Sequence, residues 1–259
     1  MTRASEPAPP PSGGASTSRL VVGLQPVREA LRAHGASVSE VWVVEPASPR
    51  LNALVRFAQA RGVARLTRVS RAALDRRTRG ARHQGVLALA PPLALKTIDA
   101  LDLTTGGPVV VLDGITDPHN FGAVVRSAVA LGAAAVVFGE NKAAPLSPAT
   151  FRASAGAIEH ANLVRVASLR DAIDHLSAQG LLTLALDAAA DTELPDIDLA
   201  GPCAVVVGAE DTGVSRGVRR ACARRARLPM APGLDSFNAS VAAALALYEV
   251  QRQRRGGVT

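Results

Sequence analysis

The sequence predicts an α/β protein whose larger, C-terminal part is built on a mostly parallel sheet. From Pro108 onward, short apolar runs alternate regularly with helical segments, a pattern typical of a parallel sheet covered on both faces. Before Pro91 the elements are shorter and predict a separate, compact α/β unit. A chain of 259 residues is long enough for two modest domains.

The N-terminal part is expected to contain a tail, a small unit and a linker. Residues 1–18 are rich in Pro, Gly and Ser and lack the apolar core of a signal peptide, which predicts a disordered tail. Residues 19–92 form the small unit, and residues 93–107 form a linker with a short helical piece. The small unit has expected strands at 21–24, 41–44 and 85–90, expected helices at 27–33, 51–61 and 71–74, and one more short element that begins at Val69.

The C-terminal part, residues 108–255, is expected to fold as one domain. Its continuous apolar runs are the length of buried strands, and the segments between them have helical spacing. Strands are expected at 109–112, 134–138, 163–166, 181–186, 203–207 and 227–228, and helices at 122–131, 148–157, 169–179, 216–223 and 239–254.

The charge balance favours a polyanionic partner. The chain has 29 Lys and Arg against 22 Asp and Glu, a formal charge of +7. A basic surplus fits nucleic acid, although a GC-rich genome that favours Arg codons would give the same bias. No apolar stretch is long enough to span a membrane, so a cytoplasmic protein is expected. Cys203 and Cys222 are too few for a disulfide framework or a zinc site and are interpreted as small buried apolar residues.

Three short motifs follow apolar strand-like runs in the C-terminal part. They read LDGITDPHNFGAVVRSA (112–128), VVVGAEDTGVS (205–215) and LPMAPGLDSFNASVAAAL (228–245). Each couples a predicted strand to a polar loop and then to a helix. Since ligands bind at the carboxyl ends of strands in open α/β folds, these loops are expected to converge on one pocket.

Several familiar sites are excluded by these residues. The Gly-x-Gly-x-x-Gly dinucleotide fingerprint is missing. The 208–215 segment has the glycine spacing of a phosphate-binding loop, but Val214 occupies the position of its lysine, and Glu210 and Asp211 would repel phosphates. No Ser-His-Asp arrangement or metal-ligand spacing is present. His119 could serve as a base, but a loop histidine bonded to backbone is the simpler interpretation.

Together the motifs resemble those of the SpoU (TrmH-type) RNA 2′-O-ribose methyltransferases of the SPOUT superfamily. Asn120, Gly122 and Arg126 match an Asn-x-Gly-x-x-x-Arg signature, and Gly208, Glu210 and Gly213 match Gly-x-Glu-x-x-Gly. The third signature, Ser-x-Asn-x-Ser-x-Ala, is matched by Ser236, Asn238, Ser240 and Ala242. The resemblance implies a knotted α/β domain preceded by an RNA-binding domain like ribosomal protein L30e. The 117–120 and 83–86 segments are most similar to the bacterial branch that modifies guanosine in 23S rRNA.

The resemblance implies S-adenosylmethionine as methyl donor and a ribose 2′-hydroxyl as acceptor. The implied cofactor-binding positions are Gly208, Leu228, Met230, Phe237 and Ser240, and the implied catalytic positions are Asn120, Arg126, Glu210, Ser236 and Asn238. Phe237 stands where the family usually has Leu.

Arg126 is expected to bind RNA phosphate and stabilise developing alkoxide charge. It is not expected to act as a base, because the guanidinium would first have to lose a proton that it holds near neutral pH. Asn120 would position Arg126 or the ribose, or cap its helix. Glu210 would orient Arg126 or Asn120, or simply favour a helix N-terminus. Ser240 is expected to cap the last helix. The arginines at 216–225 have two possible roles. They either lie on a solvent-exposed helix face or contact phosphates of the RNA.

RNA is the expected partner, with no role for DNA or a membrane. Because aromatic residues make up only 3% of the chain, the grip on RNA is expected to use phosphates, 2′-hydroxyls and shape more than base stacking. The expected RNA-binding residues are Arg76, Arg77, Arg79, Arg82 and His83. The resemblance also implies a homodimer. A tRNA ribose methyltransferase and a non-catalytic rRNA-binding assembly factor are the alternatives.

Overall fold

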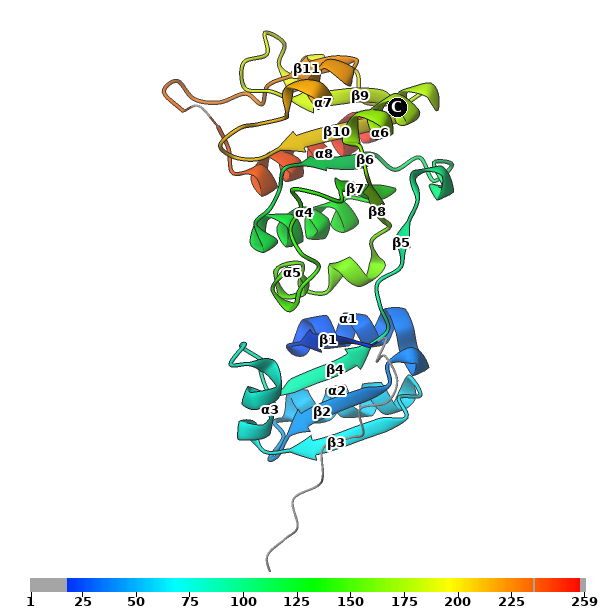
Figure 1. Cartoon of the computed structure of the whole chain (residues 1–259), viewed down its shortest axis with the longest axis vertical. Coiled ribbons are helices and arrows are strands. Elements are labelled where there is room, and N and C mark those ends of the chain that lie inside the picture. The colour runs from blue at the N-terminus through cyan, green and yellow to red at the C-terminus, as the bar shows by residue number, and fades with distance from the viewer. Residues whose placement is uncertain (1–17, 235, 257–259) are drawn as a thin grey trace, which may run out of the picture.

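The computed structural model describes residues 18–234 and 236–256, which form two sheets in two units. The units lie end to end, with α5 (Pro148–Ala153) beside the junction (Figure 1). We call residues 19–90 the N-terminal unit and residues 95–256 the C-terminal unit. The predicted tail lies outside the described residues, apart from Ser18.

The N-terminal unit is a four-stranded sheet in the order β1-β4-β2-β3, in which β2 and β3 pair in parallel and the other two neighbouring pairs are antiparallel. Val27 and Leu31, one helical turn apart, bury the face of α1 that packs on this sheet. Val69 ends β3 instead of beginning a new element, because the parallel pairing with β2 extends from Arg65 to Val69. The elements are β1 (Arg19–Val22), α1 (Leu24–His34), η1 (Gly35–Ser37), β2 (Glu40–Val44), α2 (Pro49–Ala60), β3 (Arg65–Val69), α3 (Arg71–Thr78) and β4 (Val86–Ala90).

The C-terminal unit is a seven-stranded sheet in the order β11-β9-β10-β6-β7-β8-β5. Every pair of neighbouring strands in it is parallel, which confirms the predicted fold class. Its strands are β5 (Leu95–Lys96), β6 (Val109–Asp113), β7 (Ala135–Gly139), β8 (Leu163–Val166), β9 (Leu182–Leu186), β10 (Cys203–Gly208) and β11 (Arg224–Ala226). Its helices are η2 (Ile98–Ala100), α4 (Pro118–Ala130), α5, η3 (Ala157–His160), α6 (Leu169–Ala178), η4 (Leu194–Asp196), α7 (Arg216–Ala221) and α8 (Ala239–Gly256).

Both faces of the larger sheet are buried because alternate strand residues pack into different clusters. Val110 and Leu112 of β6 join the core under α4 and α8, whereas Val109 and Val111 join the core under α6 and α7. Side chains on a strand alternate between the two faces, so a strand covered on both sides must be apolar throughout. This is why continuous apolar runs predicted these strands.

Several local boundaries differ from the predictions. β1 spans Arg19–Val22 and not 21–24, because its pairing with β4 begins at Arg19, and α5 ends at Ala153 and not at 157. The predicted linker contributes β5, which pairs with β8 at the sheet edge. The final strand is Arg224–Ala226 and not 227–228, because pairing with β9 runs from Arg224 to Ala226. Two arginines of that strand are exposed, so its apolar signal is weak.

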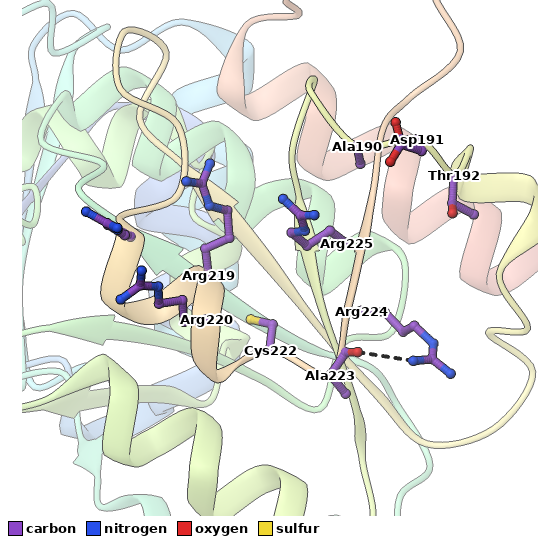
Figure 2. Close-up of a pocket in the computed structure, with 10 residues that line it drawn as sticks. Ala190, Asp191, Thr192, Arg219, Arg220, Cys222, Ala223, Arg224 and Arg225 are labelled. Carbon is purple, nitrogen blue, oxygen red and sulfur yellow. Dashed lines mark hydrogen bonds between the residues drawn. The ribbon is translucent and has the colours of Figure 1, made fainter.

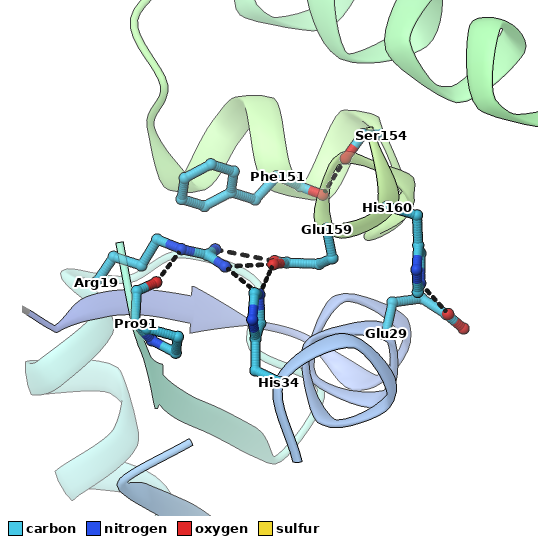
Figure 3. Close-up of polar contacts among 8 residues, drawn as sticks. All are labelled: Arg19, Glu29, His34, Pro91, Phe151, Ser154, Glu159 and His160. Carbon is cyan, nitrogen blue, oxygen red and sulfur yellow. Dashed lines mark hydrogen bonds and ion pairs between the residues drawn. The ribbon is translucent and has the colours of Figure 1, made fainter. Parts of the chain in front are cut away.

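The two units meet through a polar cluster centred on Glu159, whose side chain is fully buried (Figure 3). Arg19 of β1 donates to both carboxylate oxygens, one of them at 2.9 Å, and its Nε donates to the Pro91 carbonyl at 2.7 Å. His34 Nε2 lies 2.9 Å from the same carboxylate. The Arg19 guanidinium also lies 4.9 Å from the centre of the Phe151 ring, so this cluster fixes α1 and β1 against α5 and η3.

We predict that Glu159→Ala lowers the free energy of unfolding by about 3 kcal/mol, because it leaves the largely buried Arg19 without its counter-charge. Chemical denaturation would measure the loss. The matched control is Asp174→Ala, which removes the exposed partner of Arg170 and is expected to cost at most about 0.5 kcal/mol. Equal stabilities for the two variants would contradict a structural role for the cluster.

Candidate functional site

The polar motifs meet at the carboxyl edge of the larger sheet. β6 and β10 are neighbouring parallel strands that end in register, with Gly208 beside Asp113. The loop after β10 is tied to the end of β6, because the Ser215 amide donates to Asp113 Oδ2 at 2.7 Å. The third motif follows β11, and β11 pairs with β9 next to β10. The topology therefore brings three distant segments to one edge.

One oxygen of Glu210 joins all three motifs. Glu210 Oε1 accepts from Asn120 Nδ2 at 3.0 Å and from the Ala239 amide at 3.3 Å. It also accepts from Asn238 Nδ2, which donates in addition to Asn120 Oδ1 at 3.0 Å. We call Asn120, Glu210 and Asn238 the Glu210 junction. A carboxylate suits this place because it accepts from several donors at once and carries a negative charge at the start of α8.

The cap of α4 is Asp117, not Asn120. The Asp117 carboxylate accepts from the amides of His119 at 3.2 Å and Asn120 at 3.1 Å, and Pro118 starts the helix. This arrangement is a typical N-cap followed by a first-turn proline. It moves the start of α4 to Pro118, earlier than predicted, and leaves the Asn120 side chain for the junction. His119 is exposed in the first turn.

Asn238, and not Ser240, caps α8. Asn238 Oδ1 accepts from the amides of Ser240 at 3.0 Å and Val241 at 3.3 Å, and from the Ser240 hydroxyl at 2.6 Å. Asn238 thus caps the last helix with its side-chain oxygen, while its side-chain nitrogen donates to Glu210 and Asn120. Ser240 supports this cap.

Arg126 lies on the exposed side of α4, six residues after Asn120. Across residues 18–234 and 236–256 its guanidinium has no hydrogen-bond or ion-pair partner, so Glu210 orients Asn120 and not Arg126. Gly122, between them in the motif, is buried where α4 crosses α5. A Cβ there would lie 2.5 Å from the Ala153 Cβ, so only glycine permits this close packing. A guanidinium without a partner is available to bind a phosphate or stabilise charge on a ligand.

A cavity of about 460 Å³ opens beside the junction. Glu210 contributes to its wall, while Asn120, Asn238 and Ser240 do not. Gly208 is required there by the fold of its own loop, because a Cβ would lie 2.1 Å from the Val214 nitrogen. Among the residues predicted from the sequence, the cavity is lined by Gly208, Glu210, Leu228, Met230, Ser236 and Phe237.

The cavity has apolar walls and an acidic side. Leu228, Met230 and Phe237 form apolar surface, while Asp187, Glu210 and Asp211 contribute carboxylates. A flat aromatic group would fit against the first set, and a cationic group would be favoured by the second.

Sequence reasoning missed the loop that follows β9. Asp187, Ala188 and Ala189 line the cavity, and the Asp187 side chain is only 10% exposed. The available signal was the position of Asp187 directly after an apolar strand, the same signal that identified the three motifs.

Neither cysteine has the properties of a nucleophile. Burial raises the pKa of the Cys222 thiol to about 12. Burial also raises the pKa of the Cys203 thiol. Both thiols are therefore protonated near neutral pH, and a thiol is a far weaker nucleophile than a thiolate.

The predicted RNA-binding residues lie in the N-terminal unit, and one of them is buried. Arg76 and Arg77 on α3 and Arg79 and Arg82 after it are exposed. His83 is only 3% exposed, because its Nε2 lies 2.9 Å from Asp75 and its Nδ1 accepts from the Gly85 amide at 2.9 Å. His83 therefore holds the loop before β4 and does not face solvent.

Comparison with known protein families identifies both units. Residues 107–248 match the model of the SpoU rRNA Methylase family. The chain belongs to this family. Residues 20–95 match the model described as RNA 2′-O ribose methyltransferase substrate binding.

Individual relatives match along nearly the whole chain. The 23S rRNA (guanosine-2′-O-)-methyltransferase RlmB of Pseudomonas syringae pv. tomato is 37% identical over 240 residues, which cover 90% of this chain and 95% of the relative. An uncharacterized tRNA/rRNA methyltransferase of Mycobacterium avium is 38% identical over 260 residues, which cover 98% of this chain and 84% of the relative. The crystal structure of the SpoU methyltransferase AviRb from Streptomyces viridochromogenes, in complex with AdoMet, superposes with a TM-score of 0.79 at 26% identity, covering 93% of this chain and 92% of AviRb.

No helix among residues 18–234 and 236–256 is long and apolar enough to cross a membrane.

We predict that Glu210→Ala loosens the start of α8, because Asn238 and the Ala239 amide lose their common acceptor. Hydrogen–deuterium exchange of peptides covering residues 236–245 should become faster. The control is Asp211→Ala, since the only side-chain partner found for Asp211 in the described part of the chain is its neighbour Thr212. Unchanged exchange in the Glu210 variant, or equal acceleration in both, would contradict the junction.

Proposed function

We propose that this SpoU-family RNA methyltransferase transfers a methyl group from S-adenosylmethionine to the 2′-hydroxyl of a guanosine ribose in 23S rRNA. The observation that carries the proposal is the Glu210 junction, which joins Asn120, Glu210 and Asn238 beside a ligand-sized cavity. The relative from Pseudomonas syringae supports the rRNA substrate by its name. The relative from Mycobacterium avium, named for tRNA and rRNA together, keeps a tRNA substrate as the alternative.

The cavity fits S-adenosylmethionine in size and chemistry. Its volume of about 460 Å³ lies in the range of small-molecule sites. Leu228, Met230 and Phe237 offer apolar surface to an adenine, and the carboxylates of Asp187 and Glu210 favour the cationic sulfonium and ammonium groups. When bound, S-adenosylmethionine supplies the methyl group. AviRb, which resembles this chain throughout, was crystallised with this cofactor.

Arg126 is the residue that we assign to the acceptor. The ribose oxygen must lose its proton as it gains the methyl group, so negative charge develops on it. The guanidinium of Arg126, which has no partner among the described residues, can donate hydrogen bonds to that oxygen or to a flanking phosphate while keeping its own protons. The hydroxyl proton would leave to solvent, to which this side of α4 is open.

Asn120, Glu210 and Asn238 act as positioning residues in this proposal. The Glu210 carboxylate holds both asparagine side chains and so sets the start of α8 relative to α4, which carries Arg126. Small errors in such alignment reduce the rate of a displacement reaction strongly.

The N-terminal unit would supply the initial grip on RNA. We propose a domain boundary within residues 93–107 and RNA contacts by the exposed Arg76, Arg77, Arg79 and Arg82. Arg77 lies 5.9 Å from the centre of the Trp42 ring, which holds this arginine near the sheet surface.

The site and substrate are tested by mapping ribose methylation across all cellular RNA with and without the gene. We expect loss of one guanosine mark in 23S rRNA, and purified protein with S-adenosylmethionine should restore an alkali-resistant linkage there. Loss of a mark in tRNA alone would overturn the rRNA substrate, and methylation of a base would overturn the reaction. A non-catalytic assembly factor would restore no mark.

We predict that Arg126→Ala lowers kcat by about 10²–10³-fold, the usual cost of removing a donor that stabilises transition-state charge. Cofactor affinity and stability should remain unchanged. Arg126→Lys should also be impaired, because an ammonium lacks the planar fork of donors. Single-turnover methyl transfer would measure the effect. A variant that keeps most of the wild-type rate would remove Arg126 from the mechanism.

We also propose a homodimer that uses an apolar stripe on α8. Ala243 and Ala246 pack inward on the unit's own core, whereas Val241, Leu245 and Tyr248 are 43%, 40% and 60% exposed. These three residues lie on one helix face by their spacing. Tyr248→Asp should convert a dimer into a monomer in sedimentation analysis, and Gln179→Asp, at the residue that follows α6, should not. A monomeric wild-type protein would refute this interface.

A further inference from the structure

A second cavity, of about 590 Å³, is lined mainly by arginines. It lies between α7, β11 and the loop after β9 (Figure 2). The guanidinium groups of Arg219, Arg220 and Arg225 lie toward the same side of the view, whereas Arg224 extends to the opposite side, beside the Ala223 carbonyl. The arginines that line the cavity are Arg216, Arg219, Arg220, Arg224 and Arg225.

Few acidic groups balance these arginines. Asp187 Oδ2 accepts from Arg219 at 3.3 Å and from Arg225 at 3.5 Å, and Asp191 is the only carboxylate on the cavity wall within the described residues. The Arg224 guanidinium bonds only to the adjacent Ala223 carbonyl, at 3.4 Å, among the contacts of the described chain.

Arg216 and Arg220 have no side-chain partner in the part of the chain that the structure describes. A basic helix on a solvated face would spread its charges around the helix. Here a helix and a separate strand instead direct like charges to one concavity, which is unfavourable unless an anion binds between them.

Asp187 and Arg219 connect the arginine cavity with the proposed cofactor cavity. Arg219 lines both cavities, and Asp187 lines the cofactor cavity while holding Arg219 and Arg225. The Asp187 side chain is only 10% exposed, so this contact is a fixed part of the wall between them. A group bound by the arginines therefore lies next to the proposed methyl donor.

We infer that the arginine cavity binds phosphodiester groups of the substrate RNA next to the reacting nucleotide. Arg216, Arg220 and Arg224 contact the phosphates, because a guanidinium matches two phosphate oxygens at once. Asp187 is a positioning residue for the remaining arginines. The lining contains no aromatic residue among those described, so the cavity grips the backbone without reading bases. The inference rests on the proposed function in taking RNA as the polyanion.

The test compares two variants of equal charge. Arg220→Gln/Arg224→Gln removes two guanidiniums from the cavity, and Arg165→Gln/Arg170→Gln removes two exposed ones elsewhere on the C-terminal unit. Fluorescence anisotropy would measure binding of a labelled, mixed-sequence single-stranded RNA over a range of KCl concentrations. An RNA of about 20 nucleotides is long enough to span several backbone contacts. Because no methyl transfer is needed, a wrong substrate assignment would leave this readout intact.

We expect the cavity variant to bind RNA about tenfold more weakly at low salt. The slope of log affinity against log salt concentration should be shallower by about 1.4, because each lost phosphate contact removes about 0.7. The control should keep the wild-type slope. Arg220→Lys/Arg224→Lys should recover most of the slope, because it restores the charges. Equal effects of the two Gln variants, or no effect of the cavity variant, would overturn the inference. Thermal unfolding of each variant checks that the fold is retained, and the single variant Arg224→Gln, with a slope shallower by about 0.7, carries the test if the double Gln variant does not fold.

Discussion

A single carboxylate oxygen, Glu210 Oε1, is the point on which the site depends. It accepts hydrogen bonds from one asparagine on α4, from another at the start of α8, and from a backbone amide of α8. These donors come from segments more than a hundred residues apart. The sheet brings the segments to one edge, and this acceptor, together with the direct bond from Asn238 Nδ2 to Asn120 Oδ1, fixes their side chains relative to one another. Glu210 also contributes to the wall of the proposed cofactor cavity.

The large-scale fold was predictable because burial on both faces requires continuous apolar strands, and such runs are visible in the sequence. The convergence of the motifs was predictable for a related reason, since parallel strands end at a common edge. The hydrogen bonds between side chains of the different motifs could not be predicted. Asn120 and Asn238 are both good helix caps, and sequence alone cannot show that Asp117 takes over the cap of α4 and frees Asn120 for Glu210. Sequence alone also cannot show that the Ser240 hydroxyl donates to Asn238 Oδ1 instead of capping α8 itself.

Other misses have one cause, which is that a polar residue can be buried or paired by tertiary contacts. His83 looked like part of a basic RNA-binding loop but is enclosed by Asp75 and the Gly85 amide. β11 is arginine-rich and was placed too late in the chain, because its pairing with β9 involves the backbone. Asp187 carried the right positional signal, but nothing in its neighbourhood showed that it would face two arginines.

The C-terminal unit thus has two cavities of opposite character that share a wall. The proposed cofactor cavity has an acidic side, and the adjoining cavity is basic. A cationic methyl donor and an anionic RNA backbone require this division, because each would be repelled by the other's surroundings. Asp187 separates the two by neutralising the arginines nearest the cofactor side. The Glu159 cluster then holds the N-terminal unit in a fixed position relative to both cavities.

The most direct test of this account is a double-mutant cycle between Asn120 and Asn238, with single-turnover methyl transfer as the readout. If Glu210 makes the two side chains parts of one unit, Asn120→Ala/Asn238→Ala should lose little more activity than either single variant. The coupling energy should then exceed about 1 kcal/mol, as for residues within one hydrogen-bond network. In a Glu210→Ala background, where the direct Asn238–Asn120 bond is still possible, the coupling should fall. Additive losses in the wild-type background, or an undiminished coupling without Glu210, would contradict the central role of Glu210.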